Sequence, residues 1–563
     1  MSRVTFWAVI HNIQAENEGI HTLALDDNIY QLRRKKLAQI EALGQPAYPY
    51  AYQATHAVPE ILARYSETTG DALAANRVDV SVAGRLVAIR TMGKAAFVHL
   101  QQQGQRLQLY IKKDAVGEKG FELFKLLDIG DHIGARGYLF RTKTNELTIH
   151  VDEITFLAKD LLPLPEKWHG LQDVELRYRQ RYVDLIVTPE VRAVFVKRAK
   201  IIQSIRQYFD SRGFIEVETP MMHPIAGGAA ARPFRTHHNT LDLDLYLRIA
   251  PELYLKRLIV GGLERVYEIN RNFRNEGIST HHNPEFTMLE FYQAYADYRD
   301  LMNLSEELLR QIAMDVNGTT VCEFEGRQLD FGKFQRLSMR DAIIEYWPDF
   351  AGDPPGMTDF ASDAGVHALI QRAADAIHAA AESGPSDEAT RTLHRLRGSI
   401  GEIQAEARKG APAGNLIASL FEHFAEHHLW QPTILYDFPV SISPLSKDKR
   451  DEPDWVERFE IYAAGMEIGN AFSELNDPEE QQRRFEQQLG QRERGDEEAH
   501  QMDEDYIRAL SYGMPPTGGE GIGIDRLTML LTGSKSIRDV ILFPLLRPEK
   551  QREDESAAGA AEG

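Results

Sequence analysis

The sequence is poor in cysteine and in long apolar runs, and each absence excludes a class of protein. Its 563 residues contain one cysteine, Cys322, so the chain forms no intramolecular disulfide and no cysteine-based zinc cluster. No apolar run approaches the roughly 18 residues that a membrane-spanning helix needs. The first residues lack the basic start, apolar core and cleavage site of a secretory signal. We therefore expect a cytoplasmic protein that does not bind a membrane.

The sequence also lacks an excess of basic residues. It has 64 Lys and Arg against 84 Asp and Glu, a formal net charge of −20. This balance argues against a protein that binds nucleic acid over its whole surface. The charge is uneven, because residues 77–157 hold 12 Lys and Arg but only 9 Asp and Glu, a net charge of +3. A locally basic module fits RNA binding, although a difference of three charges also arises by chance.

The first part of the chain divides into an extension, a helical segment and a strand-rich module. Residues 1–27 show no periodicity and are interpreted as an extension. A helical segment is predicted over 28–76, and it begins with a helix whose basic face either is solvated or contacts RNA. Residues 77–160 hold five short β-branched stretches, with a helical interruption near 117–127. This pattern is typical of an OB-fold barrel that binds oligonucleotides, but it also fits another small barrel.

The remainder of the chain reads as one large α+β domain. A Pro-containing linker is predicted at 161–175, and the domain follows at 176–548. Apolar residues at helical spacing predict a helix over 190–212. The Ala-rich residues 351–415 are interpreted as a helical insertion that needs an apolar surface to pack on. The polar, small residues 549–563 are expected to be disordered.

Three segments carry the most specific signal, and their order matters. They are GFIEVETPMM (213–222), FRNEG through HHNPEFTMLEFYQAY (273–295) and GEGIGIDRLTMLL (519–531). This order resembles motifs 1, 2 and 3 of the class II aminoacyl-tRNA synthetases. The resemblance implies an antiparallel catalytic sheet flanked by helices, behind an N-terminal OB-fold.

Further segments narrow the resemblance to the lysyl-tRNA synthetases, which join lysine to tRNA(Lys) by way of lysyl-adenylate. These segments are GGAAARPF (227–234), APELYLKRL (250–258) and MEIGNAFSEL (466–475), together with the OB-like module. The resemblance covers about 28–350 and 416–548. It implies a homodimer with the first motif at the two-fold interface.

Alternation along two predicted strands indicates the floor of a ligand site. Successive side chains of a strand point to opposite faces. In PEFTMLEFY (284–292) the odd positions are apolar and core-like. The even positions mix aromatic, carboxylate and phenol groups: Phe286, Met288, Glu290 and Tyr292. Asn470, Phe472 and Glu474 share one face of GNAFSEL in the same way. The alternative is that both faces are merely solvated.

The lysine ammonium needs acceptors and negative charge, and a buried charge left unpaired loses binding energy. The surplus of acids here fits lysine better than aspartate, although Lys256 and Arg257 would weaken that argument if they pointed inward. The resemblance assigns seven lysine-binding residues: Gly228 and Glu252 for the α-amine, Arg274 and Asn470 for the carboxylate, Glu474 and Tyr292 for the ε-ammonium, and Glu290 nearby.

ATP binding requires its phosphates to be neutralised and aligned, a task suited to arginine. The resemblance makes Arg274 and Arg526 the catalytic pair. It assigns six ATP-binding residues: Arg274 at the α-phosphate, Arg526 at the γ-phosphate and above the adenine, Phe286 beneath the adenine, Glu276 and Asn283 at its edge, and His282 at the triphosphate. No residue looks like a covalent nucleophile, so catalysis is assigned to positioning and charge neutralisation.

Two further expectations concern acids. Glu460 and Glu467 flank an apparent hairpin turn, and the resemblance makes them ligands of Mg²⁺, which binds few carboxylates together with phosphates. The alternative is two exposed acids on a hairpin. Glu520 departs from the family pattern, because an apolar residue is expected between Gly519 and Gly521. It is predicted either to be exposed or to face ATP and weaken its binding.

The OB-like module supplies candidate anticodon readers. Phe97 and Gln108 match positions that resemble anticodon-binding residues of this class, with Arg85 as a third candidate. An aromatic ring can stack on an unpaired base, and an amide can read its edge. Three other functions remain open: a ligase for aspartate or asparagine, a paralogue that attaches lysine to a protein, and a non-catalytic RNA-binding protein.

Overall fold

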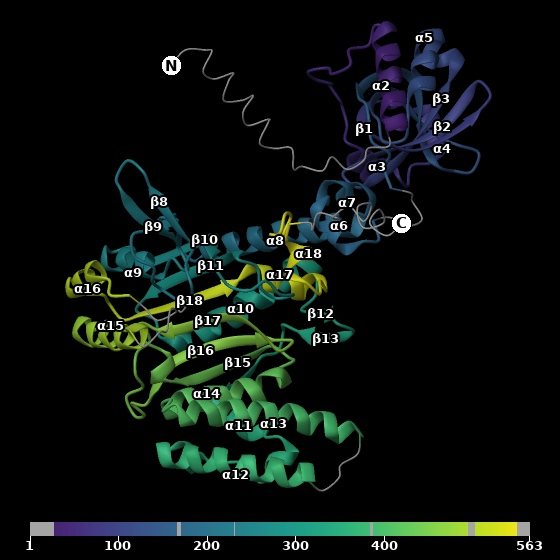
Figure 1. Cartoon of the computed structure of the whole chain (residues 1–563). Coiled ribbons are helices and arrows are strands. Elements are labelled where there is room, and N and C mark those ends of the chain that lie inside the picture. Colours follow the sequence, from purple (N-terminus) through teal and green to yellow (C-terminus); the bar gives the residue numbers. More distant parts are fainter. Residues whose placement is uncertain (1–26, 166–170, 230, 383–386, 494–500, 549–563) are drawn as a thin grey trace, which may run out of the picture. The chain divides into compact units, whose positions relative to one another are not determined.

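The chain folds into two compact units, Met1–Arg192 and Ala193–Gly563, which are described separately (Figure 1). The predicted tail and all but the last residue of the predicted extension lie outside the described residues. The predicted domain boundaries stay predictions. The computed structural model describes residues 27–165, 171–229, 231–382, 387–493 and 501–548.

The first unit is built around a closed five-stranded barrel with strand order β1-β2-β3-β5-β4, which confirms the predicted OB-fold. Alternate side chains of the strands point into the barrel core. In β2, Val98 and Leu100 are fully buried, whereas Phe97 and His99 are only half-buried. The strands are β1 (Asp79–Met92), β2 (Ala95–Gln102), β3 (Gln105–Lys112), β4 (His132–Arg141) and β5 (Leu147–Ala158), with α5 (Lys113–Leu126) at the predicted interruption.

Short helices flank the barrel: α2 (Asp27–Ala42), α3 (Val58–Tyr65), α4 (Gly70–Ala75), α6 (Val174–Arg179) and α7 (Arg181–Val187). The basic face of α2 is divided. Arg33 pairs with Asp160 at 2.9 Å, and Lys36 pairs with Asp128 at 2.5 Å. These two ion pairs therefore hold α2 against the barrel. Fewer basic side chains of that face are free to contact RNA than the sequence indicates.

The second unit contains an eight-stranded sheet of order β14-β15-β16-β17-β18-β11-β10-β6. Its central pairs are antiparallel, as expected, but the two outermost pairs, β14–β15 and β10–β6, are parallel, so the sheet is mixed. The strands are β6 (Ile215–Glu216), β10 (Arg265–Phe273), β11 (Glu285–Ala294), β14 (Gln335–Ser338), β15 (Thr433–Pro439), β16 (Trp455–Ala463), β17 (Met466–Ser473) and β18 (Thr517–Gly523).

Helices α8 (Pro189–Asp210), α10 (Tyr298–Asn317) and α17 (Ile524–Thr532) pack on the apolar face of the sheet. In α8, Ile201, Ile205 and Phe209 recur every four residues and are fully buried. These residues share one core with Leu289 and Phe291 of β11. The opposite face of the central strands is thereby left for a cavity.

The predicted insertion forms α12 (Asp363–Glu382) and α13 (Asp387–Arg408), which pack with α11 (Met339–Glu345) and α14 (Ala413–Phe424). Figure 1 shows these helices together beyond β15. Their core also contains Leu435, Trp455 and Tyr462 from the sheet. The apolar surface that the insertion needs is therefore formed by α14 and α11, which in turn pack on β15 of the catalytic sheet.

Smaller elements complete the second unit: β7 (Met222–His223), β8 (Arg235–His238), β9 (Leu243–Leu247), α9 (Glu252–Val260), β12 (Val321–Phe324), β13 (Arg327–Asp330), α15 (Pro478–Glu493), α16 (Glu504–Ser511) and α18 (Ile537–Val540). Four short 3-10 helices lie at Asp349–Ala351, Met357–Phe360, Glu426–His428 and Val440–Ile442. Among the described residues, no helix combines the length and apolarity required to span a bilayer.

Candidate active site

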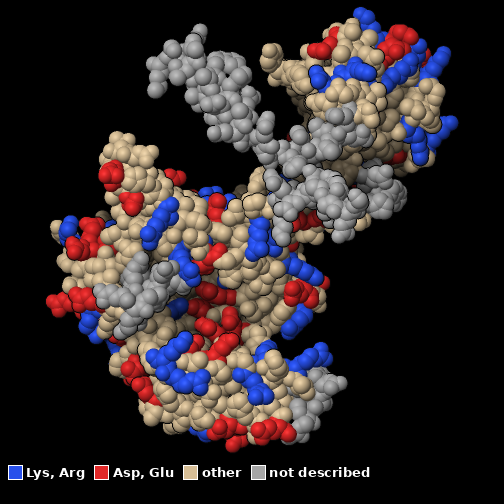
Figure 2. Space-filling model, viewed as in Figure 1, with Lys and Arg blue, Asp and Glu red and all other residues tan. Residues whose placement is uncertain are grey.

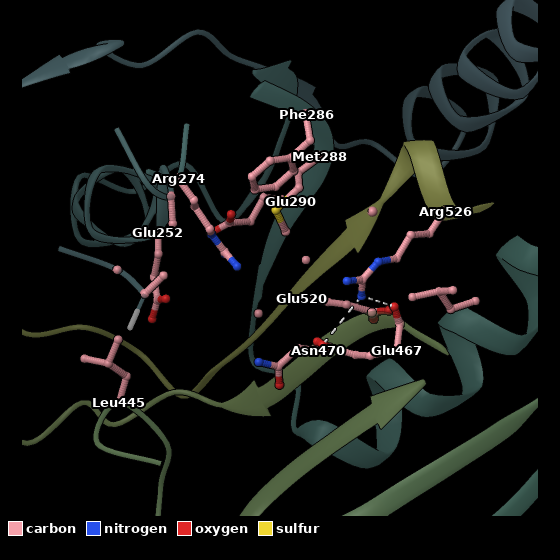
Figure 3. A pocket seen from close by; sticks show the side chains of 18 of the residues that line it. Glu252, Arg274, Phe286, Met288, Glu290, Leu445, Glu467, Asn470, Glu520 and Arg526 are labelled. Atoms are coloured by element: carbon pink, nitrogen blue, oxygen red, sulfur yellow. Dashed lines mark hydrogen bonds and ion pairs between the residues drawn. The ribbon is translucent and has the colours of Figure 1, made fainter. Parts of the chain in front are cut away.

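A cavity of about 610 Å³ opens over β11, β17 and β18 in the second unit. Most of the residues singled out in the sequence line it, and Figure 3 shows several of them pointing inward. In Figure 2, acidic side chains gather in a hollow of this unit. Figure 3 shows Glu252 and Glu290 on one side of the cavity with Arg274 beside them, and Arg526 with Glu467 on the other side.

The strand β11 has the two faces that its alternation predicts. Leu289 and Phe291 are fully buried in the core. The even-numbered side chains instead line the cavity: Phe286, Met288, Glu290 and Tyr292. The polar face is therefore a cavity floor rather than a solvated surface.

The acidic end of the cavity is formed by Glu252, the first residue of α9, and by Glu290 and Tyr292 of β11. The hydroxyl of Tyr292 donates to Glu290 Oε1 at 2.8 Å. Burial raises the pKa of Glu290 to about 8, and the charge of Glu252 adds to the rise. Glu290 is therefore mostly neutral near pH 7 while no cation is bound.

Glu474 lies just behind the lining residues. It is 1% exposed, and its Oε1 lies against Gly519, where even a Cβ would collide with it and with the ring of Tyr292. The glycine of the third motif therefore lets Tyr292 and Glu474 approach each other. Gly228 has a φ of +90° and lies beside Glu252 at the same end of the cavity.

Lys256 points toward the acidic end of the cavity. An inward Lys256 or Arg257 was expected to weaken the argument that a surplus of acids there favours lysine. Its Nζ donates to Glu252 Oε1 at 2.5 Å and forms an ion pair with Glu474 Oε2. Arg257, the next residue on α9, instead donates to Asp503 at 2.8 Å outside the cavity. The inward cation is shared by two acids, so the acidic end keeps a surplus of negative charge.

Arg526 lies at the other end of the cavity, and Arg274 lies between it and the acidic end. The guanidinium of Arg274 lies 5.1 Å from the centre of the Phe286 ring, so Arg274, not Arg526, covers the ring expected beneath adenine. Arg526 donates to the backbone oxygen of Glu467 at 2.5 Å (Figure 3). It also lies 3.1 Å from His282 Nε2, whose pKa is lowered by burial and by that positive charge.

The remaining predicted ATP-binding residues follow β10 in the loop before β11. Glu276 is exposed and lines the cavity mouth. Asn283 is buried and donates to the backbone oxygen of Glu285 at 2.6 Å. Its Oδ1 has no hydrogen-bond partner within the described ranges, so this acceptor is available to a ligand.

Glu460 and Glu467 lie on the two strands of a hairpin, β16 and β17, as their spacing predicts. The turn consists of Ala464 and Gly465, both with positive φ. Glu467 lines the cavity, whereas Glu460 accepts from Arg458 and Tyr462, each at 2.6 Å. Burial raises the pKa of Glu460, and the charge of Glu467 adds to the rise.

Arg458 is a cavity residue that the sequence analysis missed. It donates to Asn470 Oδ1 at 3.1 Å and to Glu460 Oε1 at 2.6 Å. It therefore connects a predicted lysine-binding residue with a predicted metal ligand. The sequence could have indicated it, because Arg458 and Glu460 are two residues apart and therefore share one face of β16.

The prediction for Glu520 was wrong in both its forms. It pairs in register with Phe291 and Ala471, whose side chains belong to the core, and it is only 2% exposed. Its carboxyl lies 2.5 Å from Ser305 Oγ on α10. Glu520 is thus neither exposed nor directed at ATP, because an even-numbered residue of β18 points away from the cavity.

In the first unit, Phe97 and Gln108 lie on adjacent strands of the barrel surface. Phe97 pairs in register with Tyr110, with ring centres 4.9 Å apart, and Gln108 donates to Glu146 at 2.7 Å. Arg85 lies elsewhere, opposite Gln101 at the other end of β2, and donates to a backbone oxygen. The barrel therefore brings together two of the three predicted anticodon readers.

Comparison with known proteins agrees with this geometry. A model described as class II tRNA synthetases (D, K and N) matches residues 173–547, and one for an OB-fold nucleic acid binding domain matches residues 80–157. The fold and the cavity are thus those of a class II tRNA synthetase. A lysine–tRNA ligase of Moorella thermoacetica is 52% identical over 530 residues, which span 94% of this chain and 100% of that protein.

Two further relatives give the same result. The lysine–tRNA ligases of Syntrophomonas wolfei and Ralstonia nicotianae are each 52% identical to this chain, over 519 and 528 residues. The matches cover 92% and 93% of this chain, and 97% of each relative. The chain belongs to the lysine–tRNA ligase family.

Proposed function

We propose that this chain activates L-lysine with ATP to give lysyl-adenylate and pyrophosphate, and then transfers lysine to the 3′ end of tRNA(Lys). The observation that carries the choice of lysine is the acidic end of the cavity, where Glu252, Glu290 and Glu474 are buried close together and Lys256 pairs with two of them. An aspartate site would need uncommitted cations there.

The lysine-binding roles follow from this geometry. The α-amine binds at Gly228 and Glu252, and Arg274 with Asn470 holds the carboxylate. Glu474 and Tyr292 hold the ε-ammonium, with Glu290 beside them. These assignments are supported by the cavity lining. All the assigned residues line the cavity except Glu474, whose carboxylate lies against Gly519, a lining residue.

ATP occupies the end of the cavity that holds Arg526 and extends to Arg274. Arg274 neutralises the α-phosphate and Arg526 the γ-phosphate, so lysine's own carboxylate attacks the α-phosphorus without a covalent enzyme intermediate. Adenine stacks on the ring of Phe286, whose neighbour in this structure is the Arg274 guanidinium. Glu276 and Asn283 read the adenine edge, and His282 contacts the triphosphate.

Magnesium fits the hairpin by its donors, because Glu467 lines the cavity beside Arg526 and Glu460 is on the facing strand. Mg²⁺ takes few carboxylates and completes its shell with phosphate and water. When bound, it neutralises phosphate charge. Arg458 and Tyr462 hold Glu460 ready for this role.

The proposal extends to the rest of the molecule. Phe97 and Gln108 read the anticodon of tRNA(Lys), and Arg85 takes a secondary part. The enzyme acts in the cytoplasm as a homodimer that is joined through the first motif. Support for the dimer comes from Ile215 and Met222 of that motif, which are about half exposed in the single chain.

The test is ATP–pyrophosphate exchange by purified protein with magnesium, with lysine, aspartate and asparagine supplied one at a time and no tRNA. Exchange with lysine alone is expected. Exchange with aspartate or asparagine would overturn the choice of substrate, and no exchange by folded protein would favour a non-catalytic RNA-binding role.

A further inference from the structure

We propose that Lys256 is a positioning residue that determines specificity for lysine: its ammonium takes one oxygen each of Glu252 and Glu474 and keeps both acids ionised for the two amines of the substrate. This inference rests on the proposed function and deepens it, because it concerns the same acidic end of the cavity.

The geometry of Lys256 is that of a fully enclosed bridge. The residue is 0% exposed and lies one helical turn after Glu252 on α9. Its Nζ donates to Glu252 Oε1 at 2.5 Å and pairs with Oε2 of Glu474, which follows β17. The same ammonium lies 5.2 Å from the centre of the Phe472 ring. An ammonium buried this deeply is stable only because both acids offset its charge.

The bridge leaves the other side of each acid available. Lys256 takes Oε2 of Glu474, whereas Oε1 lies against Gly519 and the Tyr292 ring, on the cavity side. Within the described ranges, Oε1 has no hydrogen-bond partner. Glu252 gives Oε1 to Lys256 and lines the cavity itself. Lys256 therefore orients both carboxylates without occupying the space of the substrate.

Charge explains why a cation belongs in a site for a cation. Burial raises the pKa of Glu474 and of Glu252, and the Lys256 ammonium opposes both rises. Burial lowers the pKa of Lys256, but the two carboxylates more than offset this effect and raise it. Two carboxylates and one ammonium leave a net charge of −1 facing the two amines of the substrate. Without Lys256, burial would raise the pKa of both acids further.

The pH dependence of this trio is set by groups from several elements. Glu290 is mostly neutral near pH 7, so it adds little negative charge before the substrate binds. The other charged or titratable groups that face the trio are Tyr292 from β11, Tyr506 from α16 and Arg458 from β16. None of them replaces Lys256, because Tyr292 and Tyr506 are neutral and Arg458 is committed to Glu460 and Asn470.

The experiment measures lysine-dependent ATP–pyrophosphate exchange by Lys256→Met from pH 6 to 9. At pH 7 the KM for lysine is expected to rise about tenfold or more, since one pKa unit corresponds to a tenfold change. The KM for ATP should change less than about threefold, because ATP binds at the other end. The acidic limb of kcat/KM for lysine should move up by about one pH unit. Lys256→Arg retains the positive charge and should keep the wild-type acidic limb.

Arg257→Met is the matched control, because it removes a cation from the same helix that pairs outside the cavity. Its lysine KM and pH profile should stay near those of the wild type. Absence of lysine-dependent exchange in the wild type would refute the proposed function itself. If the wild type exchanges but Lys256→Met keeps its acidic limb, or weakens lysine and ATP equally, Lys256 is only structural and the inference fails. If Lys256→Met does not fold, Lys256→Gln decides by the same readouts.

Discussion

Among single residues, Glu520 is the side chain whose chemistry is most constrained by its neighbours. Ser305 Oγ lies 2.5 Å from Glu520 Oε2 and 2.7 Å from the backbone oxygen of Leu301. A serine hydroxyl has one proton and can donate to only one of these acceptors. A protonated Glu520 that donates to Ser305 satisfies all three groups. Burial raises the pKa of Glu520 to about 8, which is consistent with that form.

This arrangement makes the stability of the second unit depend on pH. The folded pKa of Glu520 is above its unfolded value, so its ionisation penalty is absent at acidic pH and grows as pH rises from about 4 to about 8. We therefore expect Glu520→Gln to stabilise the fold, by about 1 kcal/mol more for each pH unit within that window. Urea unfolding from pH 5 to 9 measures this difference. The exposed Glu323 provides a control as Glu323→Gln, and a gain for Glu520→Gln that is independent of pH would contradict the prediction.

The alternation of side chains along a strand predicted which residues of β11 line the cavity, but it could not identify every site residue. Glu290 and Tyr292 lie where a period of two puts them. Lys256 and Arg257 are neighbours on a helix, about 100° apart, and only the packing of α9 decides which one points inward. The pairing of Lys256 with Glu474 joins residues 218 positions apart, so no local pattern contains it.

At the scale of elements, β18 contributes to the lysine site because Gly519 has no side chain. A Cβ at Gly519 would overlap both Glu474 and the Tyr292 ring. We expect Gly519→Ala to raise the KM for lysine about tenfold or more, since small displacements in a site cost heavily. At Gly523 the nearest atom to an added Cβ is 3.8 Å away, so Gly523→Ala should change the KM for lysine by less than about threefold. Steady-state exchange kinetics compare the two, and equal effects would contradict this account of β18.

The insertion offers a prediction for a helix. Gly401 lies within α13, and an added Cβ there would meet no heavy atom within 4 Å. Gly401→Ala should raise the free energy of unfolding by about 0.5–1 kcal/mol, because glycine costs that much in a helix interior. Gly410 has a φ of +80°, so Gly410→Ala should instead be destabilising. Denaturant unfolding of the second unit measures both; a loss of stability in Gly401→Ala would show that α13 is strained there.

Elements with strong periodicity could be predicted from the sequence, and short ones could not. The helix predicted over 190–212 is α8, Pro189–Asp210, and five strands lie within 77–160 as predicted. In the first motif only Ile215–Glu216 forms a strand, which pairs with the single parallel partner β10. The surface beneath the insertion could not be named, because Leu435 and Tyr462 come from strands that are separate from it in sequence.

At the scale of the whole molecule, we expect the second unit to bind the amino acid and the first unit to bind RNA. Phe97→Ala should raise the KM for tRNA(Lys) about tenfold or more, because base–aromatic stacking is worth about 1–3 kcal/mol. Lysine-dependent pyrophosphate exchange should not change, because that reaction needs only the second unit. Tyr50, an exposed aromatic residue of the first unit, serves as the control in Tyr50→Ala. Aminoacylation and exchange measured together test the prediction; a loss of exchange in Phe97→Ala would contradict it.

The overall composition predicted less than the arrangement of charges. A net charge of −20 seemed unfavourable for an RNA-binding protein, yet it is a sum over many separate surfaces. Figure 2 shows part of the acidic surplus gathered in a hollow of the second unit. Where charges lie depends on the fold, so composition alone could not distinguish a substrate pocket from a solvated surface.

The insertion is not a detachable module, although its sequence texture suggests one. Tyr462 packs against Phe421 of α14, the helix on which α12 and α13 rest, with ring centres 5.7 Å apart, and its hydroxyl donates to Glu460, a proposed magnesium ligand. Trimming the helices to obtain a minimal enzyme would uncover that ring and loosen the carboxylate behind it. Attempts at miniaturisation should therefore keep these helices, and mutations that weaken them should impair turnover as well as folding.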